Sequence, residues 1–516
     1  MSDRGFWRRA QAKPAATALV DHEGRQWTFG ELYGEVNAVS NALLDLGVEP
    51  RECLAVVMRN EEAMFEVLLA AMQLGLYFTP INYHATASEI EYILEDSSSV
   101  ALFVSEEFAD TAAQAADAVG LAEDRRFVSG TASGYTSLDQ LKQGASRELP
   151  PNRIGGQIMQ YTSGTTGKPK GVKRPITGVD ADEATEGLRW LFEFFGLTPG
   201  EDDVWLVTSP LYHTANISLA SNSIHFGFTI ILMDGWTPEG TLERIERYGV
   251  TATHMVPTQF VRLLGLDERT RQAYDTSSLR YVLHGAAPCS IEVKQAMLDW
   301  WGPVIYEYYG STEVGATLAR PEEWLERPGT VGRPFPISTL KILDDDGNEV
   351  APHEVGWVYM RQGEDKFEYH NDPEKTENVR HGDLLTVGDL GYVDEDGFLF
   401  LCGRDAEVII RGGVNIYPAE SEGLLTAHEA VEDVAVIGVP DEEYGEQVKA
   451  VVVPAPGVVP SEELAQALIE HCQEHLARFK CPSSVDVVES LPRDPNGKLF
   501  KRRVREAYWD GDAKAI

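Results

Sequence analysis

The 516-residue sequence predicts an α/β fold that ends in a small α+β unit. Three observations lead to this prediction. Over the first part of the chain, helical and strand patterns alternate, which is typical of largely parallel sheets. From about Thr339 the pattern changes to short strands joined by Asp/Gly turns, which favours antiparallel pairing. Near Arg404–Glu407 it changes again, and we therefore place a domain boundary at Gly403–Glu407.

The first elements follow from local patterns. In "ALVDHEGRQWTFGEL", alternating apolar residues flank Glu23-Gly24 and predict a two-stranded hairpin. The next stretch has a capping threonine at Thr28, a glutamate three residues on at Glu31, and Gly47 at its end, so a helix is expected. The run "CLAVVM" is continuously apolar, as is typical of a parallel strand buried on both faces.

The same order recurs along the chain. Helices around Glu62–Leu74 and Ala87–Asp96 precede the apolar runs "YFTPI" and "VALFVS". "EGTLERIERYGV" precedes "ATHMVP", and "IEVKQAMLDWW" precedes "PVIYEYYG". Beyond the boundary lie two strands ("VEDVAVIGVP" and "QVKAVVVPA"), a helix ("SEELAQALIEHCQEHLARFKCP") and a basic tail ("GKLFKRRVRE"). This last part is expected to be a compact unit of roughly 110 residues.

The charge balance excludes some partners. Lys and Arg total 44 and Asp and Glu total 82, so the formal net charge is −38. Such a field repels nucleic acid and anionic lipid surfaces, and no nucleic-acid partner is expected. A site for an anionic nucleotide must therefore create its own local positive potential.

The cysteines and the apolar runs indicate a cytoplasmic protein. The five cysteines form no C-x-x-C pair and no Cys/His cluster at zinc spacing, which predicts reduced, scattered thiols. The N-terminus lacks the apolar run of a signal peptide. The longest apolar candidate, residues 63–78, is interrupted by Glu66, Gln73 and Gly75, so it predicts a buried helix and no membrane span.

One glycine-rich segment points to phosphate binding. "YTSGTTGKPKG" (residues 161–171) contains four Ser/Thr hydroxyls, three glycines and two lysines. Backbone N–H groups, hydroxyls and lysines of this kind can surround a polyphosphate. The segment does not fit the Walker pattern, since Pro169 follows Gly167-Lys168. The chain also lacks G-x-G-x-x-G and G-x-S-x-G. By composition alone, a flexible linker fits the segment equally well.

The order of residues in this segment is more specific than its composition. It resembles the signature of the adenylate-forming superfamily, which includes acyl-CoA synthetases, peptide-synthetase adenylation domains and relatives of firefly luciferase. The resemblance continues in order through "PLYH", "HGAAP", "YYGSTE", "GTVGRPFP", "VGDLGYVDEDGFLFLCGR", "IIRGGVNIYPAE" and "PRDPNGKLFKRRVRE". It covers nearly the whole chain, and the protein is identified as a member of this superfamily.

The resemblance implies a fold and a division of the chain. The fold implied is a large N-terminal domain of two α/β subdomains and a β-barrel-like subdomain, followed by a small mobile α+β domain. Residues 1–403 would bind ATP and the acid, 404–407 would form the hinge, and 408–516 would form the C-terminal lid.

The resemblance also implies a nucleotide site. The residues expected in it are Thr162, Ser163, Gly164, Thr165, Thr166, Gly167, Lys168, Lys170, Gly285, Ala286, Ala287, Pro288, Tyr308, Tyr309, Gly310, Ser311, Thr312, Asp389 and Arg404. Adenine would stack on Tyr309, and Asp389 would accept hydrogen bonds from the ribose hydroxyls. Arg404 would reach ribose or phosphate. Outside the motif, a lone aspartate in a turn is ordinarily only a turn former.

Three residues are implied in catalysis. Thr312 would hydrogen-bond the α-phosphate, and Glu313 would be an oxygen ligand of Mg²⁺ close to the hydroxyl of Thr162. Lys498 would reach the α-phosphate and carboxylate oxygens in the transition state, where a cation stabilises developing charge. Without "PNGK", Lys498 would be interpreted as one lysine of a basic tail.

Further positions are implied for the acid and for CoA. His213, Gly285 and Gly310 would line the acid channel, although a lone histidine is often structural. Gly412 and Gly413 would lie along the pantetheine tunnel, where a missing side chain lets a thin thiol arm pass the backbone.

The reaction that the resemblance implies has two steps. A carboxylate and Mg·ATP give acyl-AMP and pyrophosphate, and the CoA thiol then takes the acyl group. The cofactors expected are ATP, Mg and CoA, and the remaining partner is a small carboxylic acid. Positioning and charge stabilisation suffice, so no covalent nucleophile is needed. A homodimer is left open.

Several reactions within the superfamily remain open. A peptide-synthetase domain would place an acidic residue near "SPLYHTANIS", which has none. A luciferase-type oxidation leaves no distinguishing mark in the sequence. An adenylating enzyme with a non-CoA acceptor also fits the motifs, as does a relative that binds ligand without turnover. Lys498, Glu313 and Asp389 argue against the last.

The hinge departs from the family pattern. Asp or Lys usually stands two residues after the Arg of "GR", whereas "GRDAE" places Ala406 there, next to Asp405. Alanine can supply the φ/ψ freedom that a hinge needs; our hypothesis is that it instead favours one of two conformations and makes the two half-reactions unequally efficient. An enzyme effective in only one half-reaction is the alternative. Small residues in "VGATLA" and around "HGAAP" leave room for the acid, and no cation is evident to pair with a second carboxylate. The expected substrate is a hydrophobic monocarboxylate, either fatty, aromatic or polycyclic.

Overall fold

The computed structural model describes residues 5–162, 169–186, 192, 197, 203–311, 315–362, 368–404, 407–411, 414–441, 444–493 and 499–509. The chain divides into two compact units, each built from segments that are separate in the sequence. Unit 1 comprises Met1–Met255, Glu268–Leu283 and Glu364–Asn378, and unit 2 comprises Val256–Asp267, His284–Gly363 and Val379–Ile516. The hinge expected at 404–407 falls inside unit 2 and stays a prediction.

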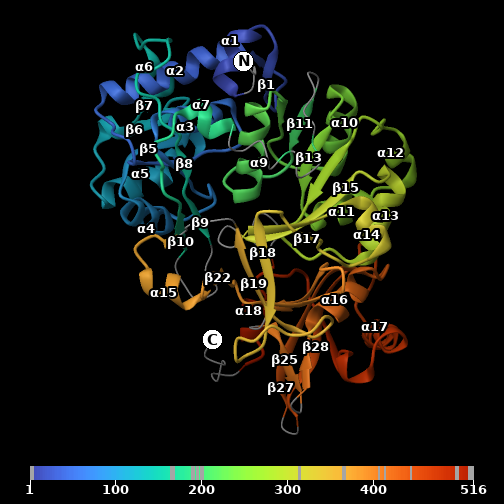
Figure 1. Ribbon diagram of the computed structural model, residues 1–516. Coiled ribbons are helices and arrows are strands. Elements are labelled where there is room, and N and C mark those ends of the chain that lie inside the picture. Colours follow the sequence, from blue (N-terminus) through green and yellow to red (C-terminus); the bar gives the residue numbers. More distant parts are fainter. Residues whose placement is uncertain are drawn as a thin grey trace. The chain divides into compact units, whose positions relative to one another are not determined.

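Unit 1 contains a parallel six-stranded sheet in the order β7-β6-β5-β3-β4-β8 (Figure 1). Its strands are β3 (Cys53–Val57), β4 (Tyr77–Pro80), β5 (Ser99–Ser105), β6 (Arg126–Ser129), β7 (Thr136–Ser137) and β8 (Gln157–Ile158). The helical segments between them are α3 (Glu62–Leu74), α4 (Ala87–Ser97), η1 (Glu106–Phe108), α5 (Ala109–Ala118), η2 (Glu123–Arg125) and α6 (Leu138–Lys142). All five residues of β3 are buried, which confirms the strand predicted from its apolar run.

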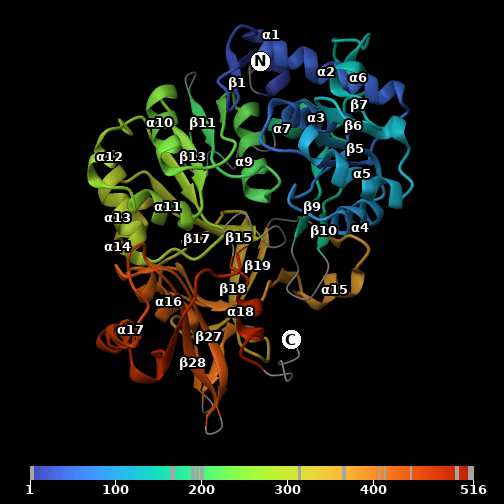
Figure 2. The same ribbon diagram turned by 180° about the vertical axis from the view of Figure 1, so that it is seen from behind.

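The second set of strands in unit 1 follows the order β14-β13-β11-β12-β1-β2. These strands are β1 (Thr17–Val20), β2 (Gln26–Thr28), β11 (Val204–Val207), β12 (Thr229–Leu232), β13 (Ala252–Met255) and β14 (Tyr281–His284). The accompanying helices are α1 (Phe6–Ala12), α2 (Phe29–Asp45), α7 (Ala181–Glu186), α9 (Thr214–His225), α10 (Pro238–Tyr248) and α12 (Glu268–Gln272). Figure 2 shows them from the side opposite to that of Figure 1. The predicted hairpin is confirmed, since β1 and β2 pair antiparallel.

Local sequence signals set the helix ends in unit 1. The Thr28 side chain accepts a hydrogen bond from the backbone N–H of Glu31, and the Glu31 carboxylate accepts one from the Thr28 N–H. This capping box starts α2 as predicted, because it satisfies N–H groups that lack partners within the helix. Helix α3 ends where Gly75 adopts the left-handed conformation at φ 67°, which glycine tolerates best.

Unit 2 contains two antiparallel sets of strands. The first consists of β15 (Ile305–Ser311), β16 (Gly315–Ala319) and β17 (Arg333–Pro334), with helices α11 (Pro257–Leu264), α13 (Ile291–Trp301) and α14 (Pro321–Glu326). The second is a six-stranded sheet of β18 (Ser338–Leu343), β19 (Gly356–Gln362), β21 (Arg380–His381), β22 (Leu384–Leu385), β23 (Asp389–Val393) and β24 (Leu399–Arg404). It confirms the antiparallel pairing predicted from the Asp/Gly turns.

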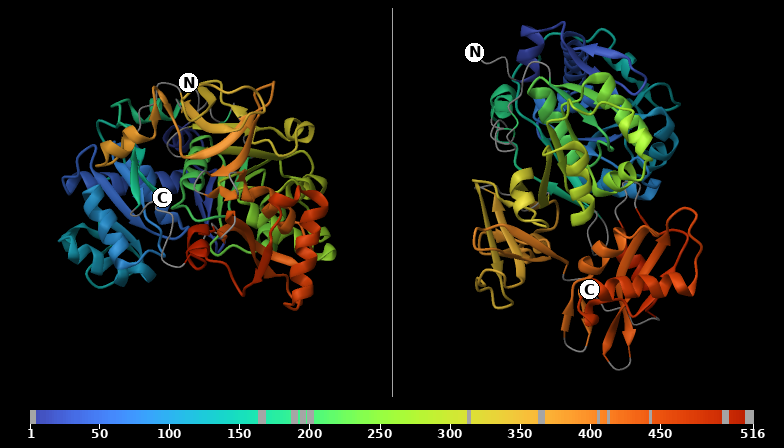
Figure 3. Two further views of the ribbon diagram at one scale, coloured as in Figure 1. Left: turned by 90° about the horizontal axis from the view of Figure 1, so that it is seen from below. Right: turned by 90° about the vertical axis from the view of Figure 1, so that its right-hand side faces the viewer.

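The rest of unit 2 is the α+β part expected near the C-terminus, coloured orange to red in Figure 3. Its sheet contains β25 (Ile409–Arg411), β26 (Val414–Ile416), β27 (Val431–Asp441), β28 (Gly445–Pro454) and β29 (Ser484–Val487). Its helical segments are α16 (Pro418–Thr426), α17 (Glu462–His475), η4 (Arg478–Lys480) and α18 (Lys501–Glu506).

Side chains of β27 and β28 alternate between the two faces of the sheet and contribute to two separate hydrophobic clusters. Val434 and Val436 pack with Leu468 of α17, whereas Ala435 and Ile437 belong to a cluster that includes Val504 of α18. Adjacent strand residues point to opposite faces, so each strand serves both clusters. Within the described residues, no helix is long and apolar enough to cross a membrane.

Candidate active site

The predicted phosphate loop connects two strands of a small sheet in unit 1. β9 (Gln160–Thr162) and β10 (Lys170–Lys173) pair antiparallel, with Thr162 opposite Lys170. β20 (Glu368–Tyr369) pairs with the other edge of β10 and precedes α15 (Pro373–Asn378). The ends of the loop are therefore fixed by strand pairing. The residues predicted to hold phosphate, Ser163–Lys168, and the side chain of Thr162 lie outside the described residues.

The residues at the base of this loop have polar partners within unit 1. The Tyr161 hydroxyl donates to Oδ2 of Asp96 at 2.6 Å. The Lys170 ammonium forms an ion pair with Asp372 and lies 5.9 Å from the centre of the Tyr369 ring. Lys170 is thus held at the base of the loop by an acidic partner, and its contact with phosphate stays a prediction.

The "PLYH" segment contacts β9, the first strand of the β9–β10 pair. Gln160 of β9 donates from Nε2 to the carbonyl of Tyr212 at 2.6 Å. Asn60 fixes the start of the segment, because its Nδ2 donates to the Ser209 carbonyl at 3.1 Å and its Oδ1 accepts from the Leu211 N–H at 2.8 Å. Sequence reasoning found neither Asn60 nor Gln160. Asn60 lies three residues after the buried strand β3, and Gln160 is the first residue of β9, so neither position carries a motif.

His213 is the N-cap residue of α9. Its ring centre is 4.5 Å from that of Tyr212. Near it, Nδ1 of His254 lies 2.8 Å from Oδ1 of Asn216. Burial, together with the neighbouring His213, lowers the pKa of His254 to about 3, so this imidazole is neutral at pH 7. A neutral, buried imidazole at this position suits the uncharged body of a substrate acid better than a second carboxylate on that acid. The role of His213 in the acid channel stays a prediction.

In unit 2, the "HGAAP" and "YYGSTE" segments approach each other closely. A Cβ atom on Gly285 would lie 2.5 Å from the Tyr308 carbonyl oxygen, so only glycine fits there. A Cβ on Gly310 would lie 2.6 Å from the Gly315 carbonyl oxygen. Ala286 has φ 65°, an uncommon left-handed conformation for alanine. Backbone strain of this kind concentrates at ligand sites, and the exposed backbone of this turn fits the flat face of a base.

The other residues of these segments complete the turn and the strand. Ala287 and Pro288 follow Ala286, and Ser311 ends β15, where it pairs with Gly315.

Asp389 connects two further residues of the predicted nucleotide site. The Tyr309 hydroxyl donates to Oδ2 of Asp389 at 2.6 Å, and Nε of Arg404 donates to Oδ1 at 3.2 Å. Asp389 and Arg404 face each other across β23 and β24. The Asp389 side chain is 11% exposed and that of Arg404 is 39% exposed. The structure therefore brings together the residues predicted for adenine, ribose and phosphate, with the carboxylate held in one orientation.

Lys294 and Glu307 form a buried ion pair between α13 and β15 that sequence reasoning did not predict. Nζ of Lys294, on α13, donates to Oε2 of Glu307, on β15, at 2.7 Å. Nε2 of His284, which directly precedes Gly285, lies 3.5 Å from the same oxygen. Burial lowers the pKa of Lys294 and raises that of Glu307, and each partner opposes the effect on the other. The pair connects α13 to β15, the strand that carries "YYGS".

The cysteines show no sign of nucleophilic activation. All five are free thiols, and burial raises the pKa of each. A nucleophilic cysteine needs a lowered pKa. The expectation that covalent catalysis by cysteine is not used is consistent with these environments.

Several predicted residues cannot be placed. Thr312, Glu313, Lys498, the tunnel residues Gly412 and Gly413, and the hinge residues Asp405 and Ala406 lie outside the described residues. Their roles as catalytic, metal-binding, tunnel and hinge residues stay predictions.

Comparison with known families identifies the chain. The model of the AMP-binding enzyme family matches residues 6–364, and the model of the AMP-binding enzyme C-terminal domain matches residues 420–498. The chain belongs to the AMP-binding enzyme family. The sequence-based recognition of an adenylate-forming enzyme is confirmed, as are its assignment as an acid–thiol ligase and the mixed α/β fold with a smaller C-terminal domain.

Individual relatives match this AMP-binding enzyme over nearly its whole length. The fatty acid–[acyl-carrier-protein] ligase ScoC of Streptomyces coeruleorubidus is 32% identical, covering 98% of this chain and 96% of its own. A 2-succinylbenzoate–CoA ligase of Bacillus pumilus is also 32% identical, covering 96% of each chain. The crystal structure of the anthranilate CoA ligase AuaEII with anthranoyl-AMP has a TM-score of 0.85 at 28% identity, covering 98% of this chain and 96% of the other.

Proposed function

We propose that this AMP-binding enzyme converts a hydrophobic monocarboxylic acid, either fatty, aromatic or polycyclic, into its CoA thioester. The reaction uses Mg·ATP and CoA, proceeds through acyl-AMP, and releases AMP and pyrophosphate. Two of the relatives named above, the fatty acid ligase and the anthranilate CoA ligase, carry a monocarboxylic acid in their names, which supports this class of substrate. The 2-succinylbenzoate of the third has two carboxylates. We further propose that the enzyme works in the cytoplasm and that a homodimer is one assembly open to it.

The arrangement around Asp389 carries the proposal. Its carboxylate receives hydrogen bonds from Tyr309 and Arg404, which orients it before a nucleotide binds. A preoriented carboxylate can accept the two ribose hydroxyls with little loss of side-chain entropy. The adjacent Tyr309 ring and the turn at Gly285 and Ala286 supply a face and a backbone surface for adenine.

The remaining steps follow from charge and position. The loop at 163–168 would hold the departing β,γ-pyrophosphate, and Lys498 would neutralise charge that develops at the α-phosphate. Mg²⁺, when bound near Thr162 and Glu313, supplies further neutralisation of the phosphates. The segment around His213, with the neighbouring Tyr212 ring and the neutral His254, would receive the apolar body of the acid.

Thioester formation with ATP, CoA and a panel of acids tests the proposal, with AMP and thioester measured together. Lys498→Ala should lower the rate of adenylation roughly 100- to 1,000-fold, the cost of removing one such stabilising group. Arg502→Ala is the matched control, because Arg502 is a nearby cation, 61% exposed and paired with Glu506. Full adenylation by Lys498→Ala would disprove the role of that lysine. Preference for amino acids, acetate or dicarboxylates would disprove the substrate class.

The acceptor and the balance of the half-reactions need separate measurements. ATP–pyrophosphate exchange reports adenylation, and thioester formation from supplied acyl-AMP reports transfer. If Ala406 favours one conformation, the two rates will be unequal, and Ala406→Asp or Ala406→Lys will bring them closer. Comparable rates in the unmodified enzyme would contradict this hypothesis. Transfer to a carrier-protein thiol but not to CoA would replace the proposed acceptor.

A further inference from the structure

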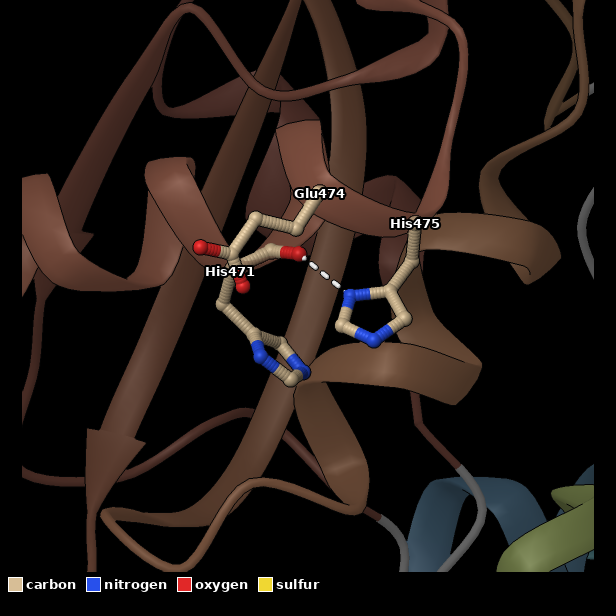
Figure 4. Close-up of side chains that lie close together, drawn as sticks. All are labelled: His471, Glu474 and His475. Carbon is tan, nitrogen blue, oxygen red and sulfur yellow. Dashed lines mark hydrogen bonds between the residues drawn. The ribbon is translucent and has the colours of Figure 1, made fainter.

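Three potential metal ligands gather on one helix of unit 2, in a part of the chain that the proposed function does not use. His471, Glu474 and His475 lie in the last turns of α17. Residues three and four apart share one face of a helix. One donor atom from each of the three lies within 4.8 Å of the other two, and Figure 4 shows the side chains gathered on the same face.

A backbone hydrogen bond orients the imidazole of His475. Nδ1 of His475 lies 2.8 Å from the His471 carbonyl oxygen, drawn as the dashed line in Figure 4. A carbonyl only accepts, so Nδ1 carries the proton and Nε2 of the neutral ring keeps its lone pair. Histidines that bind metals almost always donate their other ring N–H to a group of this kind.

Packing limits the motion of His471. Its ring is half-buried, and the His428 ring meets it edge to face with 4.9 Å between ring centres. Nδ1 of His428 accepts from the Ala430 N–H at 3.2 Å, so the proton of the neutral ring is on Nε2. In this tautomer His428 offers no free lone pair, and it acts as a positioning residue beside His471.

The electrostatic environment favours a cation. Helix α17 contains four glutamates and no lysine or arginine. The cluster lies at the C-terminal end of the helix, where unpaired carbonyls give a partial negative charge. The whole chain has a net charge of −38, which adds a long-range attraction.

The ligand chemistry selects the ion. Two imidazole nitrogens and one carboxylate oxygen suit zinc and its transition-metal neighbours, whereas Mg²⁺ prefers oxygen ligands alone. In a tetrahedral site with bonds of about 2.1 Å, the donors would be about 3.4 Å apart. The present spacing of up to 4.8 Å closes by about 1.4 Å when the exposed Glu474 changes its rotamer and the two imidazole rings shift slightly.

We propose that His471, Glu474 and His475 form a binding site for a divalent transition-metal ion of the zinc class, separate from the nucleotide site. The three ligands leave one coordination position for water. A bound ion would join successive turns at the end of α17, immediately before η4. Nothing in this proposal depends on the substrate or on the acceptor of the ligase.

Zinc titration of the full-length, tag-free protein tests the site. The protein is first treated with a chelator and then titrated in excess Mg²⁺, with a chromophoric zinc chelator as competitor. The intact protein should bind one zinc ion that Mg²⁺ does not displace. His475→Ala should weaken that binding at least about tenfold, because even the loss of a residue that only orients a ligand costs 10–100-fold. Glu474→Gln should also weaken it, and both side chains are exposed, so folding is spared.

The matched control is His353→Ala. His353 is also exposed and faces a carboxylate, with Nε2 2.9 Å from Oε2 of Glu395. It is not one of the three proposed ligands on α17. This variant should bind zinc like the intact protein. Cobalt substitution should give visible absorption bands of tetrahedral intensity that are lost in His475→Ala. Equal zinc affinity in the intact protein and His475→Ala, an unchanged affinity in Glu474→Gln, or full displacement by Mg²⁺ would overturn the proposal.

Discussion

Removal of one partner from the buried Lys294–Glu307 pair should destabilise the fold far more than an exposed ion pair would. Lys294→Met keeps much of the side-chain volume but leaves the Glu307 carboxylate without its cation. The Lys294 side chain is 0% exposed and that of Glu307 is 9% exposed, so water cannot replace the lost partner. Breaking a pair of this kind costs about 3–5 kcal/mol, most of it the cost of an unpaired buried charge.

The cost should depend on pH. Burial already raises the pKa of Glu307, and loss of the lysine raises it further. A raised carboxyl pKa contributes stability below its unfolded value that is lost as pH rises through its folded value. Lys294→Met should therefore be less damaging at pH 5.5 than at pH 8. Adding Glu307→Gln removes the stranded charge and should recover most of the loss.

Urea denaturation followed by tryptophan fluorescence measures these differences. Lys341→Met is the matched control, since Nζ of Lys341 lies 2.7 Å from Oε2 of Glu349 but the two side chains are 41% and 57% exposed. The exposed pair should contribute less than about 1 kcal/mol. If Lys294→Met and Lys341→Met shift the unfolding midpoint equally, burial is not the source of the effect and the reasoning fails.

Two further predictions concern the nucleotide site and the pH dependence of stability. Tyr309→Phe removes the hydroxyl that donates a hydrogen bond to Asp389, a bond worth about 1.5 kcal/mol or more. This variant should raise the KM for ATP roughly tenfold in pyrophosphate exchange. An unchanged KM would show that Asp389 needs no orienting partner. Burial, then the neighbouring Glu66, raises the pKa of Glu62 from 4.5 to about 10. The free energy of unfolding should thus fall between pH 6 and 9 by up to about 1.4 kcal/mol per pH unit. In Glu62→Gln, the urea midpoint should fall less steeply with pH. Parallel pH profiles of the intact protein and the variant would contradict the assignment.

Elements set by short-range signals could be predicted closely. The helix Glu62–Leu74 has the bounds expected from the sequence, and the capping box at Thr28 formed as its spacing indicated. The helix near the C-terminus was expected to run to about residue 482, but α17 ends at His475, where Leu476 turns extended at φ −125°. Leu476 packs into the core there, a tertiary contact that periodicity does not reveal.

Contacts between distant segments could not be predicted in the same way. Asn60 and the Ser209 carbonyl are 149 residues apart in the sequence, and each position alone is unremarkable. Lys294 on an amphipathic helix would ordinarily be placed in solvent, and only the three-dimensional structure shows it against Glu307. The ordered motifs identified the family, but the supporting residues behind the site depend on packing that no motif encodes.

The pairing of Asp389 with Arg404 has a consequence for the order of events in catalysis. Arg404 is the last residue of β24 and the first of the predicted hinge segment 404–407, in which Asp405 and Ala406 are the expected pivot residues. A rotation about residues 405 and 406 would leave the Asp389–Arg404 contact intact, because both partners precede the pivot. Lys498, which follows it, would be carried away. Under the proposed roles of these residues, the adenylate would remain held by its ribose while the group that assisted its formation departs, clearing a path for the incoming acceptor without release of the intermediate.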